Sequence, residues 1–432
     1  MKHLKRIFIA LIIVSGLLLL AVIPLQQIAA PSPLVSNMAS PPPNEVRALW
    51  VVREAMTSPE AVKEMVRRAN EAGFNNLLVQ VRGRGDAYYQ ARWEPRAASL
   101  KDQASDFDPL ALTIKEAHAV GIKVHAWINT FLVADAGILP EAPDHAMYKH
   151  PEWLAVPLGI ANELYRGDPK AQNYSDTLVN FARNNKEELE GIFFSPAHPG
   201  VKEQIYNLWI DITERYDVDG LHFDYIRYPN RQFDYSRTSL DRFRAELEKT
   251  MSPEDRKRFA DAAANNPLAY VTAFPERYSQ FQRDQVTDLV ERVYQGVKAR
   301  KPNAIVSAAV FANDKDAYEA RCQDWKLWLK RGILDVVCPM AYSGDTATFS
   351  RQIAVAVGVR GNNQVWAGIG SWQIPVGSTL EKISASREKG AQGFILFSYN
   401  ATIQSSEFNP NADYLTRVRD ALNMHSASAS SR

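Results

Sequence analysis

Eight short apolar runs, each followed by an amphipathic helical pattern, constrain the fold of this chain more than any other feature. The runs are rich in β-branched and aromatic residues, as buried strands are. In the gaps, apolar residues repeat at the spacing of one helix face, as Val62, Val66 and Ala69 do. The predicted strands are Glu45–Val52, Asn75–Arg82, Lys123–Asn129, Asp219–Ile226, Ala304–Phe311, Leu334–Tyr342, Gln364–Gly370 and Gly393–Asn400.

Strands that alternate with helices pair in parallel through right-handed crossovers, and eight such units close into a (β/α)8 barrel. The alternative is an open, doubly wound sheet, which binds dinucleotides through a glycine-rich loop after its first strand. Here that place is taken by VVREAMTSPE, residues 51–60. The sequence therefore predicts an α/β fold, a TIM barrel over residues 45–422.

Two connections between a strand and its helix are too long for simple loops. They cover residues 130–200, after the third strand, and residues 229–280, after the fourth. Both leave the carboxyl ends of strands, which is the face where TIM barrels carry their active sites. We expect these insertions to wall a binding cleft; the alternative is a purely structural cap.

Residues 1–30 have the pattern of an export signal or a membrane anchor. Lys2, Lys5 and Arg6 precede an apolar run over Ile7–Pro24, and cations before a hydrophobic stretch are typical of exported proteins. The run is long for a cleaved signal and close to the shortest membrane-spanning helix. We expect the body of the protein to lie outside the cytoplasmic membrane, either secreted or anchored by an uncleaved helix.

The remaining terminal segments and the composition add three expectations. Residues 31–44 are rich in Pro and Ser and predict a tether, and residues 423–432 predict a polar tail. The formal net charge of +1 argues against nucleic acid as a partner. Cys322 and Cys338 are the only cysteines, too few for a disulfide scaffold, so we expect two buried thiols. We also expect a monomeric protein.

Polar side chains occupy the inward positions near the ends of neighbouring strands. Because side chains alternate along a strand, His222 and Asp224 share the face opposite to that of the apolar Leu221 and Phe223. The apolar pair should face the helices and the polar pair the barrel interior. The same alternation turns His125 and Asn129 inward on the third strand, and Gln80 and Arg82 on the second, so three strands direct polar groups at one place.

Asp224 is the main catalytic candidate, because it ends the fourth strand at the mouth of the predicted barrel. We expect Arg82 or Arg227 to hold its carboxylate ionised, since a nearby cation favours the charged form. An ionised carboxylate in a concave site is suited to attack on, or support of, an oxocarbenium-like centre. The alternative is an Asp–Arg ion pair that only fixes the loop.

Glycoside hydrolysis normally requires a second carboxyl group. The candidates at the mouth are Glu54, Asp86 and Asp345, which follow the first, second and sixth strands. We rank Asp345 first, because it closely follows an apolar strand and Tyr342 could orient it. A solvated acid on a loop is the alternative for each of them.

Aromatic and histidine side chains complete the predicted site. Tyr342, Trp372 and Tyr399 end the last three strands, and aromatic faces at a barrel mouth could stack on sugar rings; packing in the core is the alternative. His125 and His222 lack the spacing of zinc ligands. We expect them to be core histidines that position Asp224 by hydrogen bonds, and we expect neither a metal nor a cofactor.

Four segments together resemble the glycosyl-hydrolase-like 10 family: residues 45–89, HPEW at 150–153, SPAHPGV at 195–201 and above all DGLHFDYIRYP at 219–229. The resemblance extends from about Glu45 to about Ala421. It implies a TIM barrel and a glycosidase-type function in the bacterial cell envelope, linked to peptidoglycan. It also implies that Asp224 is catalytic and that Arg227 and Tyr228, from the same motif, shape the site. Some relatives are lipoproteins, whereas no Cys follows the apolar run here.

The sequence thus leaves three functions to compare. The first is an exported glycoside hydrolase acting by carboxylate chemistry on a cell-envelope polysaccharide, with peptidoglycan glycan strands as substrate. The others are a non-catalytic glycan-binding barrel and a metal-dependent deacetylase. The predicted catalytic residues are Asp224 and Asp345, and the predicted substrate-binding residues are Arg82, Asp86, His125, Asn129, His222, Arg227, Tyr228, Tyr342, Trp372 and Tyr399.

Overall fold

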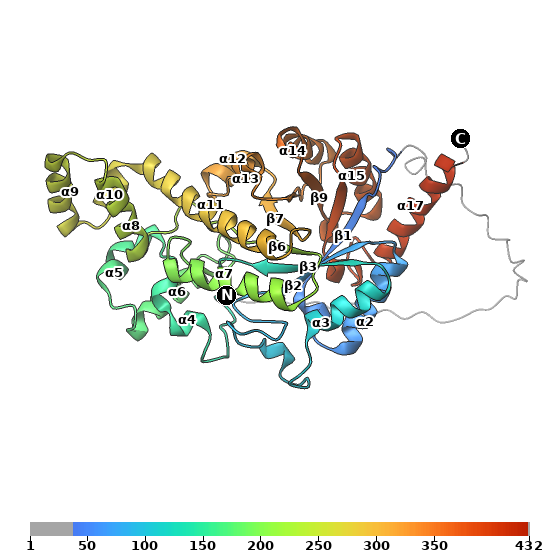
Figure 1. Cartoon of the computed structure of the whole chain (residues 1–432), viewed down its shortest axis with the longest axis horizontal. Helices are drawn as coiled ribbons and strands as arrows, with labels where there is room; N and C mark the ends of the chain where they lie inside the picture. Colours follow the sequence, from blue (N-terminus) through green and yellow to red (C-terminus); the bar gives the residue numbers. More distant parts are fainter. Residues whose placement is uncertain (1–37, 431–432) are drawn as a thin grey trace, which may run out of the picture.

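The computed structural model describes residues 38–430, which contain a closed barrel of eight parallel strands (Figure 1). Around the barrel the strands follow the order β1, β10, β9, β8, β7, β6, β3, β2, and the order closes on itself. Each of the eight predicted strands is present, so the predicted TIM barrel is confirmed. The barrel strands are β1 Val46–Val51, β2 Asn76–Arg82, β3 Lys123–Asn129, β6 Gly220–Asp224, β7 Ile305–Phe311, β8 Val336–Met340, β9 Gln364–Gly370 and β10 Gly393–Phe397.

The helices between the strands cover the outside of the barrel. Several begin with a capping side chain and a proline in the first turn, where the missing N–H costs nothing. In α2, for example, the Ser58 hydroxyl accepts a hydrogen bond from Ala61 N, and Pro59 is the first helical residue. The outer helices are α2 Pro59–Glu71, α3 Pro109–Ala119, α7 Pro199–Arg215, α11 Pro275–Arg300, α13 Trp325–Arg331, α14 Thr346–Val359, α15 Val376–Glu388 and α17 Tyr414–Ser430.

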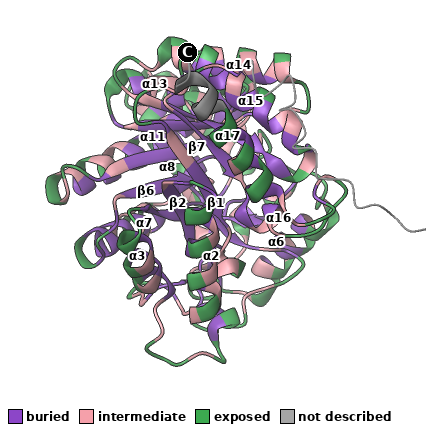
Figure 2. Ribbon diagram, turned by 90° about the vertical axis from the view of Figure 1, so that its right-hand side faces the viewer, coloured by how far each residue is buried: buried purple, intermediate pink, exposed green. Residues whose placement is uncertain are grey.

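The alternation of side chains along the strands separates two apolar layers of buried residues. Figure 2 shows the ribbons of the central strands in the colour of buried residues. The outer layer lies between strands and helices and contains Leu221 and Phe223, and the Phe223 ring lies 3.9 Å from that of Trp209 in α7. The inner layer fills the barrel and includes Trp50 and Trp127. The predicted orientation of the fourth barrel strand is therefore confirmed.

Two insertions stand at the carboxyl ends of β3 and β6, and Figure 1 shows their helices gathered at one end of the molecule. The second insertion packs around a core of its own, centred on Phe243 and Tyr278. The first contains β4 Leu132–Ala134, β5 Ile192–Phe193, α4 Ala146–Lys149, α5 Ala161–Arg166 and α6 Gln172–Asn184, and the second contains α8 Arg237–Glu248, α9 Pro253–Asn265 and α10 Ala269–Ala273.

The predictions for the terminal segments and for the two cysteines can be compared with the described residues. The apolar run at residues 7–24 lies outside the described residues, and within residues 38–430 no helix is long and apolar enough to cross a membrane. Residues 31–37 of the predicted tether lie outside the described residues. Met38, in the middle of that tether, is 7% exposed and packs into the outer core. The predicted polar tail is helical as far as Ser430, as the end of α17. Cys322 and Cys338 are both buried free thiols, as expected.

Candidate active site

Asp224 lies at the end of β6, in a cavity of about 350 Å³ at the carboxyl end of the barrel. Its side chain is 10% exposed. The cavity is roofed by one residue of the first insertion and otherwise lined by strand ends and the loops that follow them. The lining residues are Trp50, Trp127, Glu190, Asp224, Tyr225, Arg227, Ala309, Phe311, Met340, Tyr342, Trp372 and Phe397.

Two neighbours hold the Asp224 carboxyl group in place. The backbone N–H of Tyr225 donates a hydrogen bond of 2.7 Å to Oδ1, and Nη1 of Arg227 lies 3.3 Å from the same oxygen. Tyr225 has a φ of +49°, a left-handed conformation that is uncommon for a bulky residue. Residues in such conformations cluster at active sites and ligand-binding sites. Its ring lies under the Arg227 guanidinium, 4.1 Å from the central carbon. The residues that follow β6 thus fold back and contact the Asp224 carboxyl group.

The surroundings of Asp224 favour its protonated form. Burial raises the pKa of Asp224 above its usual value, although the Arg227 cation and the Tyr225 N–H both act to lower that pKa. Arg227 is adjacent and acts in the expected direction, towards a lower pKa, but removal from water has the larger effect. A carboxyl group with a raised pKa is suited to donate a proton.

Glu190 is the second carboxyl group of this cavity, and the sequence analysis did not identify it. It precedes β5 in the first insertion, and its carboxylate lies 3.3 Å from Nη2 of Arg227. One guanidinium thus contacts both Asp224 and Glu190. The Glu190 side chain is 48% exposed, whereas that of Asp224 is 10% exposed. Two carboxyl groups in such different surroundings are the arrangement expected of a general acid and a base or nucleophile.

Aromatic rings form the opposite wall of the cavity. Tyr342 and Trp372 meet edge to face, with ring centroids 4.9 Å apart, and Phe397 lies 5.7 Å from Tyr342. Trp372 is 39% exposed, so part of its face is open to a ligand. Burial, and next the charge of Asp224, raise the pKa of Tyr342 well above its usual value, so this phenol stays protonated and able to donate. Tyr342 and Trp372 thus line the same cavity as Asp224.

The two predicted histidines lie in the barrel interior. His222 accepts a hydrogen bond of 3.0 Å from the Trp50 indole and lies 2.8 Å from Ser307 Oγ. His125 lies 2.9 Å from Asn76 Oδ1. Burial lowers the pKa of His222 well below its usual value and lowers the pKa of His125 to about 4, so both rings are neutral near pH 7. Their hydrogen bonds fix barrel side chains rather than Asp224, which corrects the positioning role expected of them.

Asn129 points inward, as predicted, and connects the second and third strands. Its Oδ1 accepts from the Trp127 indole at 2.9 Å and from Gln80 Nε2 at 3.3 Å, and its amide donates to Gly83 O at 2.9 Å. Asn129 thereby fixes the orientation of Trp127, which lines the cavity with Asp224.

Arg82 lies away from Asp224, contrary to the prediction. The pairing of β2 with β3 shifts register after Gln80, so that Arg82 stands opposite Ile128, a residue of the outer layer. Its guanidinium is fully buried, 2.7 Å from Glu94, and donates to the carbonyl oxygens of Asn129 and Thr130. The register shift reversed the face that strict alternation assigns to Arg82, and the side chain supports the start of the first insertion instead.

Asp345 lies outside the cavity, which corrects its rank as the first candidate for the second carboxyl group. It is exposed and forms the N-cap of α14, where its side chain accepts from Thr348 N at 2.8 Å and from the Thr348 hydroxyl at 2.6 Å. These hydrogen bonds lower its pKa. An acid shortly after a strand is a frequent helix cap, and that is its structural role here.

Three more predicted residues are placed elsewhere. Tyr228 is fully buried beneath the second insertion, where burial and then Asp234 raise its pKa well above the usual value. Tyr399 is 2% exposed and belongs to the outer apolar layer, at the start of α16 Tyr399–Thr402. Asp86 lines a neighbouring cavity at the barrel mouth. Asp224, Arg227, Tyr342 and Trp372 are the predicted residues that the structure brings together.

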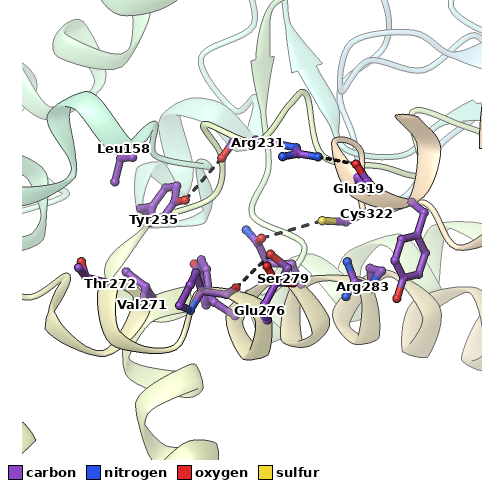
Figure 3. Close-up of a pocket in the computed structure, with 14 residues that line it drawn as sticks. Leu158, Arg231, Tyr235, Val271, Thr272, Glu276, Ser279, Arg283, Glu319 and Cys322 are labelled. Carbon is purple, nitrogen blue, oxygen red and sulfur yellow. Dashed lines mark hydrogen bonds and ion pairs between the residues drawn. The ribbon is translucent and has the colours of Figure 1, made fainter. Parts of the chain in front are cut away.

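A further cavity of about 610 Å³ lies between the start of α11 and α12 Asp314–Glu319, outside the barrel (Figure 3). Arg231 and Glu319 form an ion pair of 2.8 Å across it, and Cys322 lies 3.9 Å from Gln282. Its lining comes from the second insertion, α11 and α12, with Leu158 of the first insertion. Asp224 at the end of β6 and Glu190 of the first insertion both line the barrel cavity instead, so we place the active site there.

No group of three or more His, Cys, Asp or Glu side chains within residues 38–430 is arranged to hold a metal ion. The Asp224 cavity offers two carboxyl groups, one guanidinium and an aromatic wall.

Comparison with solved structures shows glycosidase barrels as structural neighbours. The catalytic domain of β-amylase from Paenibacillus polymyxa superposes with a TM-score of 0.58 at 12% identity, covering 88% of this chain and 100% of that one. The α-L-fucosidase isoenzyme 2 from Paenibacillus thiaminolyticus superposes with a TM-score of 0.54 at 15% identity, covering 89% and 50%. At such identities these likenesses establish the fold.

Sequence comparison identifies relatives and a family. Glycosyl hydrolase YngK of Bacillus subtilis is 21% identical over 72% of this chain and 56% of its own length. Glycosyl hydrolase DigH of Escherichia coli is 21% identical over 71% of this chain and 63% of its own length, so the chain spans less than two thirds of each relative. The model of the family described as glycosyl hydrolase-like 10 matches residues 45–388, and the chain belongs to this family.

Proposed function

We propose that this protein is an exported glycoside hydrolase that cleaves a cell-envelope polysaccharide, with peptidoglycan glycan strands as its substrate. The observation that carries the proposal is the pair of carboxyl groups on one guanidinium: Asp224, buried and with a raised pKa, and Glu190, open to solvent. Membership of the glycosyl hydrolase-like 10 family and the names of the two relatives support the reaction class.

The two carboxyl groups divide the chemistry between them. Asp224, whose pKa is raised by burial, donates a proton to the glycosidic oxygen as the bond to the anomeric carbon breaks. Glu190 supplies the carboxylate on the solvent side, where it accepts the proton of the attacking water or attacks the anomeric carbon itself. Arg227 contacts both groups and stabilises negative charge as the proton leaves Asp224.

The aromatic wall supplies binding. Trp372 and Tyr342 present a partly open, apolar face opposite the carboxyl groups, and such faces pack well against the apolar face of a pyranose ring. The cavity of about 350 Å³ holds a ligand of the size of one or two sugar units.

The proposed export and envelope location are supported by the N-terminal sequence. The cations Lys2, Lys5 and Arg6 before the apolar run at residues 7–24 are the pattern of an export signal or an uncleaved anchor. Either places the catalytic barrel on the outer side of the cytoplasmic membrane, where the proposed polysaccharide lies.

The test compares the full-length wild-type protein with Asp224→Asn and with the matched control Asp345→Asn, an exposed acid outside the cavity. Purified peptidoglycan glycan strands are incubated with each protein, and the soluble products are identified by mass. We expect Asp224→Asn to lower the rate by about 10²- to 10⁴-fold and the control to keep it. Cleavage by Asp224→Asn at the wild-type rate would refute the assignment, and binding without cleavage by the wild type would favour the glycan-binding alternative.

A further inference from the structure

A second cavity, of about 340 Å³, lies at the carboxyl end of the barrel beside the Asp224 cavity. Its walls come from the residues that follow the first three barrel strands, including η1 Arg53–Met56 after β1 and the start of the first insertion after β3. Its lining residues are Arg53, Glu54, Arg84, Asp86, Tyr88, Pro95, Arg96, Ala98, Ser99, Ala134, Asp135, Ile138, Leu139, Pro140, Glu141, Ala142 and His145.

A row of side-chain hydrogen bonds connects the two cavities. Arg53 Nη1 donates to Gln80 Oε1 at 2.8 Å, and Gln80 Nε2 donates to Asn129 Oδ1 at 3.3 Å. The same Asn129 oxygen accepts from the Trp127 indole at 2.9 Å. Arg53 lines the second cavity and Trp127 lines the Asp224 cavity, so the two hollows share a wall built from fixed, hydrogen-bonded side chains.

The lining of the second cavity offers paired donors and acceptors. Arg84 and Asp135 form an ion pair of 3.0 Å with about a third of each side chain exposed, and Arg53 and Glu54 form another of 3.2 Å. Such pairs keep free N–H groups and carboxylate oxygens for the hydroxyl and amide groups of a sugar. Next to them Ile138, which is 75% exposed, gives an apolar surface.

Two glycines fix the shape of this wall. A Cβ on Gly83 would lie 2.7 Å from the Arg53 side chain, and one on Gly85 would lie 2.5 Å from His145 Nε2. Gly85 has a φ of +72°, and His145 Nε2 lies 2.9 Å from Arg84 O. The residues after β2 therefore fold closely against Arg53 and His145, which gives a preformed hollow.

We propose that this second cavity is a saccharide subsite, which binds sugar units of the same chain whose scissile bond lies in the Asp224 cavity. This inference rests on the proposed function and adds to it that the substrate is an oligomer or polymer held across both hollows. The consequence is a dependence on chain length: each sugar unit that reaches the second cavity adds binding.

The experiment measures binding without turnover. Full-length Asp224→Asn protein is titrated with the dimer and the tetramer of β-1,4-linked N-acetylglucosamine, and the ratio of the two dissociation constants is determined by calorimetry. We expect the tetramer to bind at least about tenfold more tightly than the dimer. Adding Ala98→Trp, which places an indole in the second cavity from an exposed position, should bring that ratio close to one.

A second variant and a control make the result specific. Arg84→Ala removes one member of the ion pair and should also lower the ratio, whereas Ala264→Trp, an equally exposed alanine in α9, should preserve it. A tetramer that binds no more tightly than the dimer, absence of binding included, overturns the inference, as does a ratio unchanged by Ala98→Trp. Failure of the proposed function is a separate result, namely no cleavage of glycan by the wild-type protein.

Discussion

The backbone N–H of Tyr225 points back at the carboxyl group of Asp224 and donates to it at 2.7 Å, from a residue whose φ is +49°. For an L-residue with a Cβ this conformation costs about 1–2 kcal/mol. The strained residue stands where the chain leaves β6. The turn that it forms gives Asp224 a fixed N–H donor next to the cavity. The aromatic ring of Tyr225 is then stacked under Arg227.

The stability of variants at Tyr225 should depend on which backbone conformations the new residue allows, rather than on the size of its side chain. Tyr225→Gly removes the ring but permits the positive φ, whereas Tyr225→Val keeps apolar surface but disfavours that conformation strongly. We expect Val to be less stable than Gly by about 1 kcal/mol or more, measured by urea unfolding. If Val proves as stable as Gly, the strained turn does not form in solution.

Glu190→Gln should change both the rate and its pH dependence. The Glu190 charge acts to raise the pKa of Asp224, so its removal lowers that pKa. Asp224 then loses its proton at a lower pH, and the alkaline limb of kcat/KM moves to lower pH. We also expect the rate to fall by about a hundredfold. The control is Glu187→Gln, which changes an exposed acid just upstream. An unshifted pH profile in Glu190→Gln would show that the Glu190 charge does not act on Asp224.

Arg227→Met should destabilise the protein far more than Arg231→Met. Arg227 is buried and contacts Asp224 and Glu190, whereas Arg231 and Glu319 form an exposed ion pair. Removing one member of a buried pair costs about 3 kcal/mol, and an exposed pair contributes under about 1 kcal/mol. Denaturant unfolding of both variants gives the comparison, and equal losses would show that the buried pair contributes no more than the exposed one.

The stability of Asp224→Asn relative to wild type should rise with pH. The folded-state pKa of Asp224 is raised by burial, so the folded protein holds this proton after the unfolded chain has lost it. Wild-type stability therefore decreases from about pH 4, where an unfolded Asp ionises, up to the raised pKa. Asn has no proton to lose. Unfolding free energies at about pH 4 and about pH 7 test this, and a difference that is constant or falls with pH contradicts it.

Strand periodicity predicted the parts of the site that lie on regular backbone. On β6 the alternation correctly turned Asp224 inward and Phe223 toward Trp209. The same rule was wrong for Arg82, because the register of β2 against β3 shifts just before it. A shift of this kind depends on the pairing of two strands and leaves no mark in the local sequence.

The second carboxyl group of the site could not be predicted from the sequence, for a different reason. Asp345 was favoured because it is near a strand end in sequence, but a carboxylate at the start of a helix serves as its cap. Glu190 lies in the irregular stretch between α6 and β5, where no periodicity places it. It lines the cavity and stands just before β5, which pairs with β4 near the end of β3.

The order of strands and helices determined the barrel, since apolar spacing is a local property that each segment carries by itself. That spacing also placed Asp224 at the mouth. The tertiary structure alone decided that Glu190 joins Asp224 on Arg227 and that burial outweighs this cation in setting the pKa of Asp224. Contacts between residues distant in sequence, and the loss of water around a charge, arise only when the whole chain has packed.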